Sequence, residues 1–109
     1  MLSSGPSKTV KDFYMACNAG DYTKAETYLA SDVKSVISSG LGSAIGGTKT
    51  LCQLSTKDGT VSSIDVKSEQ INGDSAQVTI VIHYKDNTTK EDSGSLVKEK
   101  DGWKLGAGH

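Results

Sequence analysis

The acidic and histidine side chains are the residues whose types could support acid/base catalysis. Asp65 has apolar neighbours, but because Ile64 and Val66 share one face of a predicted strand, Asp65 falls on the opposite face. His83 has the side chain suited to general base catalysis near neutral pH, and the same alternation places it away from the face that carries Tyr84. Since neither faces the expected core, the sequence predicts no general acid or base and, as its first interpretation, no catalytic site.

Metal, nucleotide and nucleophile motifs are also missing from the sequence. His83 and the terminal His109 are too far apart to suggest a metal site. The glycine-rich run at residues 42–50 differs from a P-loop because Thr48 stands between the glycine and Lys49. No serine stands in a G-x-S-x-G motif. We therefore expect no metal and no cofactor.

The two cysteines, Cys17 and Cys52, are far apart in the sequence and form no C-x-x-C pair. The preferred interpretation is two buried free thiols that pack as small apolar groups. A disulfide between them is the alternative.

Aromatic side chains are the remaining candidates for a function. Large rings supply much of the core of a small domain, so each is first of all a core or cavity-wall residue. If a ligand binds, these rings would form the walls of its pocket, with the hydroxyls as its polar points. The ligand-pocket candidates are Tyr14, Tyr28, Tyr84 and Trp103.

Length and composition restrict the classes of protein that remain. The 109 residues fit one domain, and we expect a flexible segment at 1–6 followed by a single domain at 7–107. A net charge of −1, with dispersed basic residues, argues against a nucleic-acid partner. No apolar run reaches the roughly 20 residues of a membrane span, so we expect the chain as given to be soluble. The short polar segment at 1–7 is typical of what remains after removal of a signal or lipid-attachment segment, which makes export and membrane anchoring hypotheses.

The first half of the sequence shows helical periodicity. Apolar residues recur at spacings of three and four over residues 7–18, and again over residues 22–30 after Asp21, a natural N-cap. A short helical turn and a loop are expected over 31–47. Thr48 is a potential cap for a further short helix that ends before Gly59.

After Gly59 the apolar period changes from about 3.6 to 2 residues, which indicates strands. Turn sequences at residues 72–73, 86–87 and 101–102 divide this region into strands at 61–71, 75–84, 88–99 and 103–107, an antiparallel meander. Gly94 interrupts the third strand and predicts a bulge or bend. The second strand places Thr79, Val81 and His83 on the face away from the helices, and these are our dimer-face candidates.

The order of these parts, with Phe13-Tyr14, Gly20-Asp21-Tyr22 and the closing run Leu96–Leu105 around Asp101-Gly102-Trp103, resembles a known family. It is similar to small bacterial exported or lipid-anchored proteins of unknown function with a lumazine-binding-like domain, in the nuclear-transport-factor-two-like, cystatin-like superfamily. The resemblance implies an α+β cone, in which a curved four-stranded antiparallel sheet wraps the N-terminal helices around an apolar cavity. Relatives with this fold include isomerases, cyclases and binding modules, so the fold does not determine the activity.

Three functions remain open at this point. The first is a non-enzymatic, exported module that binds a small apolar or aromatic ligand or acts as a homodimer. The second is a small isomerase-like or cyclase-like enzyme, which would require an acid or a histidine inside the cavity. The third is an interaction domain of the cell envelope, which would have no well-formed cavity.

Overall fold

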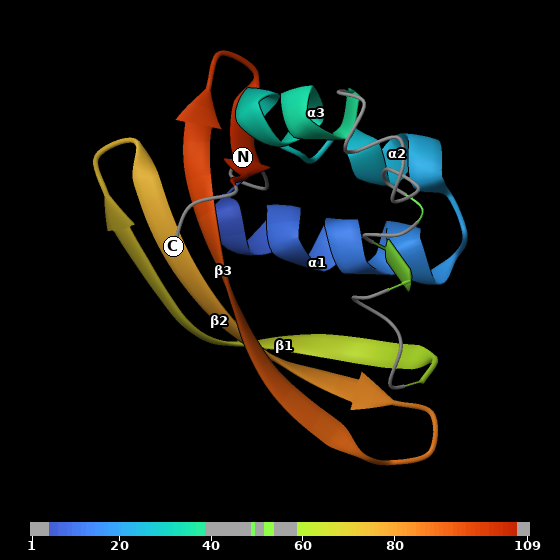
Figure 1. The fold of residues 1–109 in the computed structure, drawn as a ribbon. Coiled ribbons are helices and arrows are strands. Elements are labelled where there is room, and N and C mark those ends of the chain that lie inside the picture. Colours follow the sequence, from blue (N-terminus) through green and yellow to red (C-terminus); the bar gives the residue numbers. More distant parts are fainter. Residues whose placement is uncertain (1–4, 39–48, 50–51, 54–58, 107–109) are drawn as a thin grey trace.

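The computed structural model describes residues 5–38, 49, 52, 53 and 59–106. Antiparallel pairing joins the strands in sequence order, β1-β2-β3-β4 (Figure 1). This confirms the predicted α+β fold with a four-stranded meander. The elements are α1 (Pro6–Asn18), α2 (Tyr22–Glu26), α3 (Ser31–Ser38), β1 (Val61–Asn72), β2 (Ser75–Tyr84), β3 (Thr89–Glu99) and β4 (Gly102–Leu105).

The sheet is curved, and the helices lie against its concave side with α1 innermost (Figure 1). Register shifts between Val61 and Ser63, and between Val66 and Ser68, mark irregularities in β1. Such bulges bend a strand and increase its twist. Of the bulge or bend predicted at Gly94, the bulge is wrong, because Gly94 pairs with Val78 in an unbroken β2–β3 register.

Turns join the strands at all three predicted places, the third at residues 100–101, directly before Gly102. Gly73 and Asn87 adopt positive φ angles of 66° and 72° between β1 and β2 and between β2 and β3. This left-handed conformation is open to glycine and tolerated by asparagine, which explains the residue types at the two turns.

The second and third helices differ from their predicted lengths. Helix α2 ends at Glu26 rather than near residue 30, because the following segment pairs with β4. The Ala30 N–H donates to the Leu105 carbonyl and the Leu105 N–H to the Tyr28 carbonyl, each over 2.8 Å. Helix α3 is longer than the predicted single turn. The loop expected after α3 and most of the further helix expected from Thr48 lie outside the described residues.

Carboxylates of the sheet hold the N-terminal ends of two helices. Glu69 of β1 accepts hydrogen bonds from the backbone N–H and the hydroxyl of Ser7, in the first turn of α1. Glu99 of β3 does the same for Ser31, the first residue of α3, over 2.9 and 3.1 Å. Both glutamates therefore satisfy backbone donors that a helix leaves unpaired at its start, and they add favourable negative charge there.

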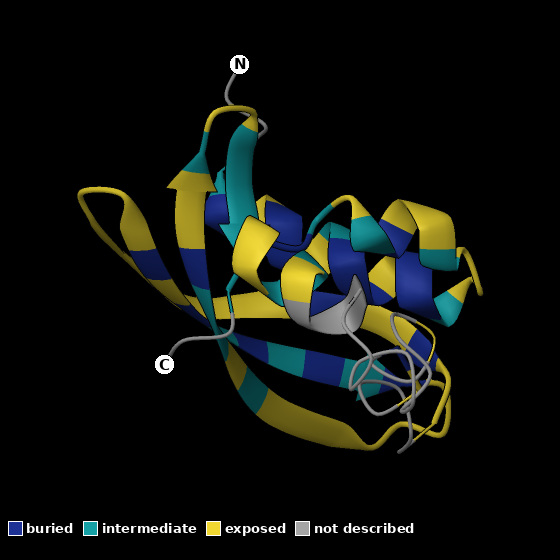
Figure 2. Ribbon diagram, turned by 45° about the horizontal axis from the view of Figure 1, so that its top comes forward, coloured by how far each residue is buried: buried dark blue, intermediate teal, exposed yellow. Residues whose placement is uncertain are grey.

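Buried side chains collect between the helices and the concave face of the sheet (Figure 2). Alternate residues of β2 are buried, as its sequence pattern predicts. The core is formed chiefly by Val10, Phe13, Tyr14, Cys17, Ala25, Leu29, Val61, Ile64, Val78, Ile80, Ile82, Tyr84 and Leu96.

A disulfide joins Cys17 at the end of α1 to Cys52, so the preferred interpretation of two free thiols is wrong. Their Cα atoms are 4.9 Å apart, within the range that a disulfide spans. Both residues are buried. The bond ties Cys52 to the C-terminal end of α1.

Candidate ligand-binding cavity

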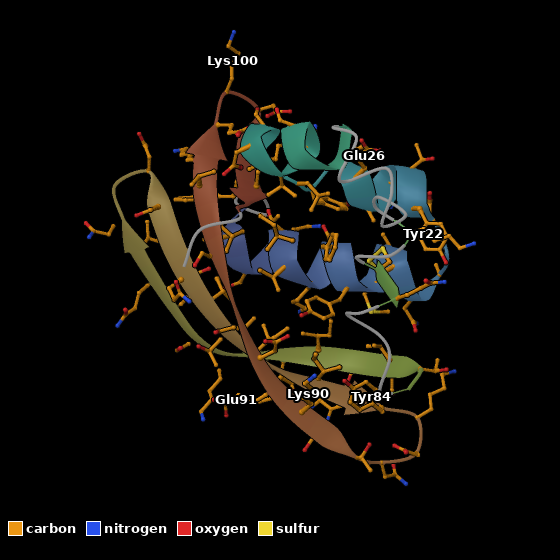
Figure 3. The ribbon with its side chains drawn as sticks, in the orientation of Figure 1. Tyr22, Glu26, Tyr84, Lys90, Glu91 and Lys100 are labelled. Atoms are coloured by element: carbon orange, nitrogen blue, oxygen red, sulfur yellow. A yellow bond between two sulfur atoms is a disulfide. The ribbon has the colours of Figure 1, made fainter. Side chains whose placement is uncertain are left out.

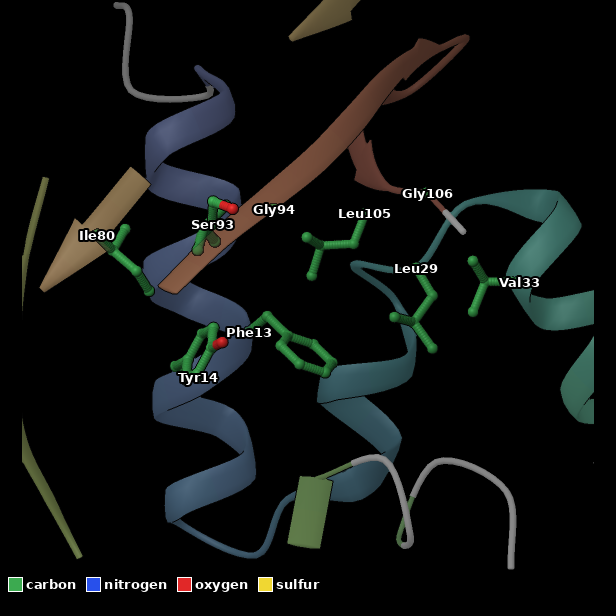
Figure 4. A pocket seen from close by; sticks show the side chains of 10 residues that line it. Phe13, Tyr14, Leu29, Val33, Ile80, Ser93, Gly94, Leu105 and Gly106 are labelled. Atoms are coloured by element: carbon green, nitrogen blue, oxygen red, sulfur yellow. The ribbon is translucent and has the colours of Figure 1, made fainter. Parts of the chain in front are cut away.

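An apolar cavity of about 310 Å³ lies between α1, the Leu29–Val33 segment and strands β2 to β4 (Figure 4). Gly94 forms part of its wall on the β3 side, and the absence of a side chain there leaves the space open. A Cβ atom at Gly94 would lie 3.5 Å from the Leu105 side chain, which is an ordinary van der Waals contact. The lining residues are Val10, Phe13, Tyr14, Leu29, Val33, Ile80, Ser93, Gly94, Leu105 and Gly106.

Tyr14 brings a hydroxyl group to this apolar lining. Its Oη donates a hydrogen bond of 2.8 Å to Oδ2 of Asp92 on β3. Burial, the hydrogen bond to Asp92 and the charge of that carboxylate all raise the pKa of the Tyr14 phenol. The phenol therefore stays protonated at physiological pH, and its proton lies between α1 and β3.

Asp92 does not line the cavity but is the hydrogen-bond partner of Tyr14, and the sequence reasoning missed it. It pairs with Ile80, so it shares the concave face with the buried Leu96, two alternations further along β3. Alternate residues of a strand share a face, so Leu96, Gly94 and Asp92 lie on the same side of β3. This alternation could have predicted that Asp92 faces the helices. The strongly polar sequence around it concealed the pattern.

The four aromatic candidates do not meet in one pocket. Tyr14 lines the cavity. Tyr28 and Trp103 line a separate surface groove of about 240 Å³ beside α1 and β4. Tyr84 is buried in the core, with its ring packed over Gly59. The structure thus brings one of the four rings to the cavity and places the other three elsewhere.

Asp65 and His83 lie on the convex side of the sheet, which confirms their predicted placement. The His83 Nε2 and Asp65 Oδ2 atoms are 2.8 Å apart, and the two side chains are 38% and 73% exposed. Glu91, also on this side, pairs with Lys67 over 2.7 Å and projects away from the helices (Figure 3). Thr79 and Val81 share this convex face and are half-buried. These groups therefore cannot reach a ligand in the cavity.

Among the described residues that line the cavity, Tyr14 is the ionisable one; no carboxylate or histidine is among them. No three histidine, cysteine or acidic side chains gather into a potential metal site within the described part of the chain. The helices at residues 6–18, 22–26 and 31–38 are all too short or too polar to span a membrane, and no other described helix could do so.

Solved structures show which class of protein this fold represents. A Campylobacter jejuni protein described as a proposed NTF2-like transpeptidase aligns with a TM-score of 0.75 and 18% identity, over 96% of this chain and all of that one. A SEC-C motif containing protein from Rhodopseudomonas palustris aligns with a TM-score of 0.69 and 9% identity, over 100% of this chain and 80% of that one. The chain has an NTF2-like fold, and this part of the predicted resemblance is confirmed.

The family can be stated more narrowly from the sequence. Residues 2–106 match the family described as Domain of unknown function (DUF4878), and the chain belongs to this family. No curated protein matches the sequence. Neither the family nor the fold determines the activity, so a function must be argued from the residues of the cavity.

Proposed function

We propose that this protein is a non-enzymatic binding module that holds a small apolar or aromatic ligand between α1 and β3. The observation that carries the proposal is the cavity of about 310 Å³, whose lining is apolar apart from few polar groups. Its size is at the lower end of the usual range for ligand sites, roughly 300–1,000 Å³. Because an engineered cavity of about 150 Å³ accepts benzene, a two-ring ligand is the appropriate size.

The contacts of Tyr14 support binding rather than catalysis. An isomerase-like or cyclase-like enzyme needs an acid or base that can exchange a proton with its substrate inside the cavity. The raised pKa of Tyr14 keeps its phenol protonated at neutral pH, so it cannot act as a base there, and its proton is already donated to Asp92. The cavity also favours the binding module over a purely structural envelope domain, which would need no such space.

Filling the cavity from β3 tests this proposal. The Gly94→Val substitution places a β-branched side chain in the cavity wall without strain from a positive φ angle, so we expect it to weaken binding of 2-naphthol at least about tenfold. Isothermal titration calorimetry measures the change. Ser95→Val is the matched control, because it introduces the same side chain at the next position of β3, which does not line the cavity. There the Ser95 hydroxyl donates a hydrogen bond to Gln77 of β2. Unmeasurable binding of 2-naphthol to the wild-type protein, or equal binding to Gly94→Val, would contradict the proposal.

Export of the full-length protein is the second part of the proposal. The support is the disulfide between Cys17 and Cys52, since structural disulfides persist mainly in oxidising compartments outside the cytosol. Thiol alkylation of native cells before reduction is the test. Alkylation of both cysteines in the native protein would contradict export.

We also propose a homodimer formed through Thr79, Val81 and His83. These residues share the convex face, and Val81 lies in register between Asp65 on β1 and Glu91 on β3. The polar neighbours restrict the apolar area that such a dimer would bury. Sedimentation velocity that shows only monomer at millimolar concentration would exclude it.

A further inference from the structure

We infer that the cavity selects ligands that donate a hydrogen bond, such as phenols, alcohols and amines, over ligands of the same shape that only accept one. This inference rests on the proposed binding function and adds the chemical class of the ligand. It follows from the direction of the hydrogen bond between Tyr14 and Asp92.

The Tyr14 hydroxyl has one proton and two acceptor lone pairs. A carboxylate only accepts hydrogen bonds, so the proton of the 2.8 Å contact belongs to Tyr14 and points at Asp92. The second carboxylate oxygen of Asp92 accepts from the Ser93 backbone N–H over 2.9 Å, which fixes the orientation of the group. The raised pKa of Tyr14 keeps the proton in place.

What Tyr14 can offer to the cavity is therefore a lone pair and not a proton. A ligand hydroxyl or amine can donate to Tyr14 Oη, while a ketone, an ether or a carboxylate would lose its hydrogen bonds to water without replacement. Figure 4 shows the Tyr14 ring and its hydroxyl among the apolar side chains of the lining.

A pair of probes isolates this hydrogen bond. We compare 2-naphthol with 2-methoxynaphthalene, in which a methyl group replaces the hydroxyl proton, by isothermal titration calorimetry at neutral pH. The readout in each variant is the affinity for 2-naphthol divided by the affinity for 2-methoxynaphthalene. Tyr14→Phe removes the acceptor, and we expect the ratio to fall about three- to tenfold from its wild-type value. Tyr28→Phe is the matched control, because Tyr28 lies in the separate surface groove, and it should leave the ratio unchanged.

Asp92→Ala provides an independent second variant. Without the carboxylate, the Tyr14 proton becomes available to the cavity, so binding of 2-methoxynaphthalene should strengthen and the ratio should fall again. An affinity ratio that is the same in the wild type, Tyr14→Phe and Asp92→Ala would overturn the donor selection while leaving the binding function intact. If neither probe binds the wild-type protein, the binding function and the donor selection both fail.

Discussion

Replacing Cys17 and Cys52 together by alanine is expected to lower the free energy of unfolding by about 3–4 kcal/mol. The disulfide closes a loop with a sequence separation of 35 residues, and the loss of chain entropy in the unfolded state gives this magnitude. In a domain of this size the melting temperature should fall by roughly 10–20 °C. Urea unfolding followed by far-ultraviolet circular dichroism measures the difference between the two proteins.

The reduced wild-type protein is the control for this experiment. A thiol reductant should shift the wild-type unfolding midpoint towards that of the Cys17→Ala/Cys52→Ala variant and should leave the variant unaffected. Equal wild-type midpoints with and without complete reduction would show that the bond does not stabilise the fold.

Leu96→Ala on β3 is the second substitution with a large expected effect, a loss of about 2–5 kcal/mol. Leu96 is 1% exposed and lies in register between Ala76 on β2 and Leu105 on β4. Its truncation removes buried apolar area and leaves a space that the three paired strands cannot readily close.

Val97→Ala is the matched control for Leu96→Ala. Val97 is the next residue of β3, points to the opposite face and is 38% exposed, so we expect its truncation to cost less than about 1 kcal/mol. Urea unfolding of both variants gives the comparison. Similar losses at the two positions would contradict the assignment of the concave face as the core side of the sheet.

The sheet was predictable from the sequence because its signals are local. The alternation in residues 75–84 and the turn residues Gly73 and Asn87 depend on neighbours along the chain, and the structure confirms all of them. The helix boundaries were less accurate, because residues 28–30 leave their helical pattern to pair with Leu105, more than 70 positions away. Helix propensity depends on the residue itself and cannot anticipate a strand partner so far along the chain.

The site was less predictable for the same reason. Tyr14 was found because aromatic residues on a predicted helix face are natural candidates, but its contact with Asp92 joins two elements 78 residues apart. The disulfide likewise joins Cys17 to a residue 35 positions further along the chain, a proximity that sequence spacing did not reveal. The cavity is likewise lined by residues from α1, the Leu29–Val33 segment and strands β2 to β4, which no local sequence pattern brings together.

The two glutamates that hold the helix starts also affect how the domain folds. Isolated helices shorter than about 12–15 residues are marginal in water, and α1 and α3 have 13 and 8 residues. The partners of their first turns, Glu69 and Glu99, come from strands that follow them by more than 60 residues. The helices therefore gain these stabilising contacts only once the sheet has formed. Helices and sheet thus belong to one cooperative unit, although their sequence patterns change completely at Gly59.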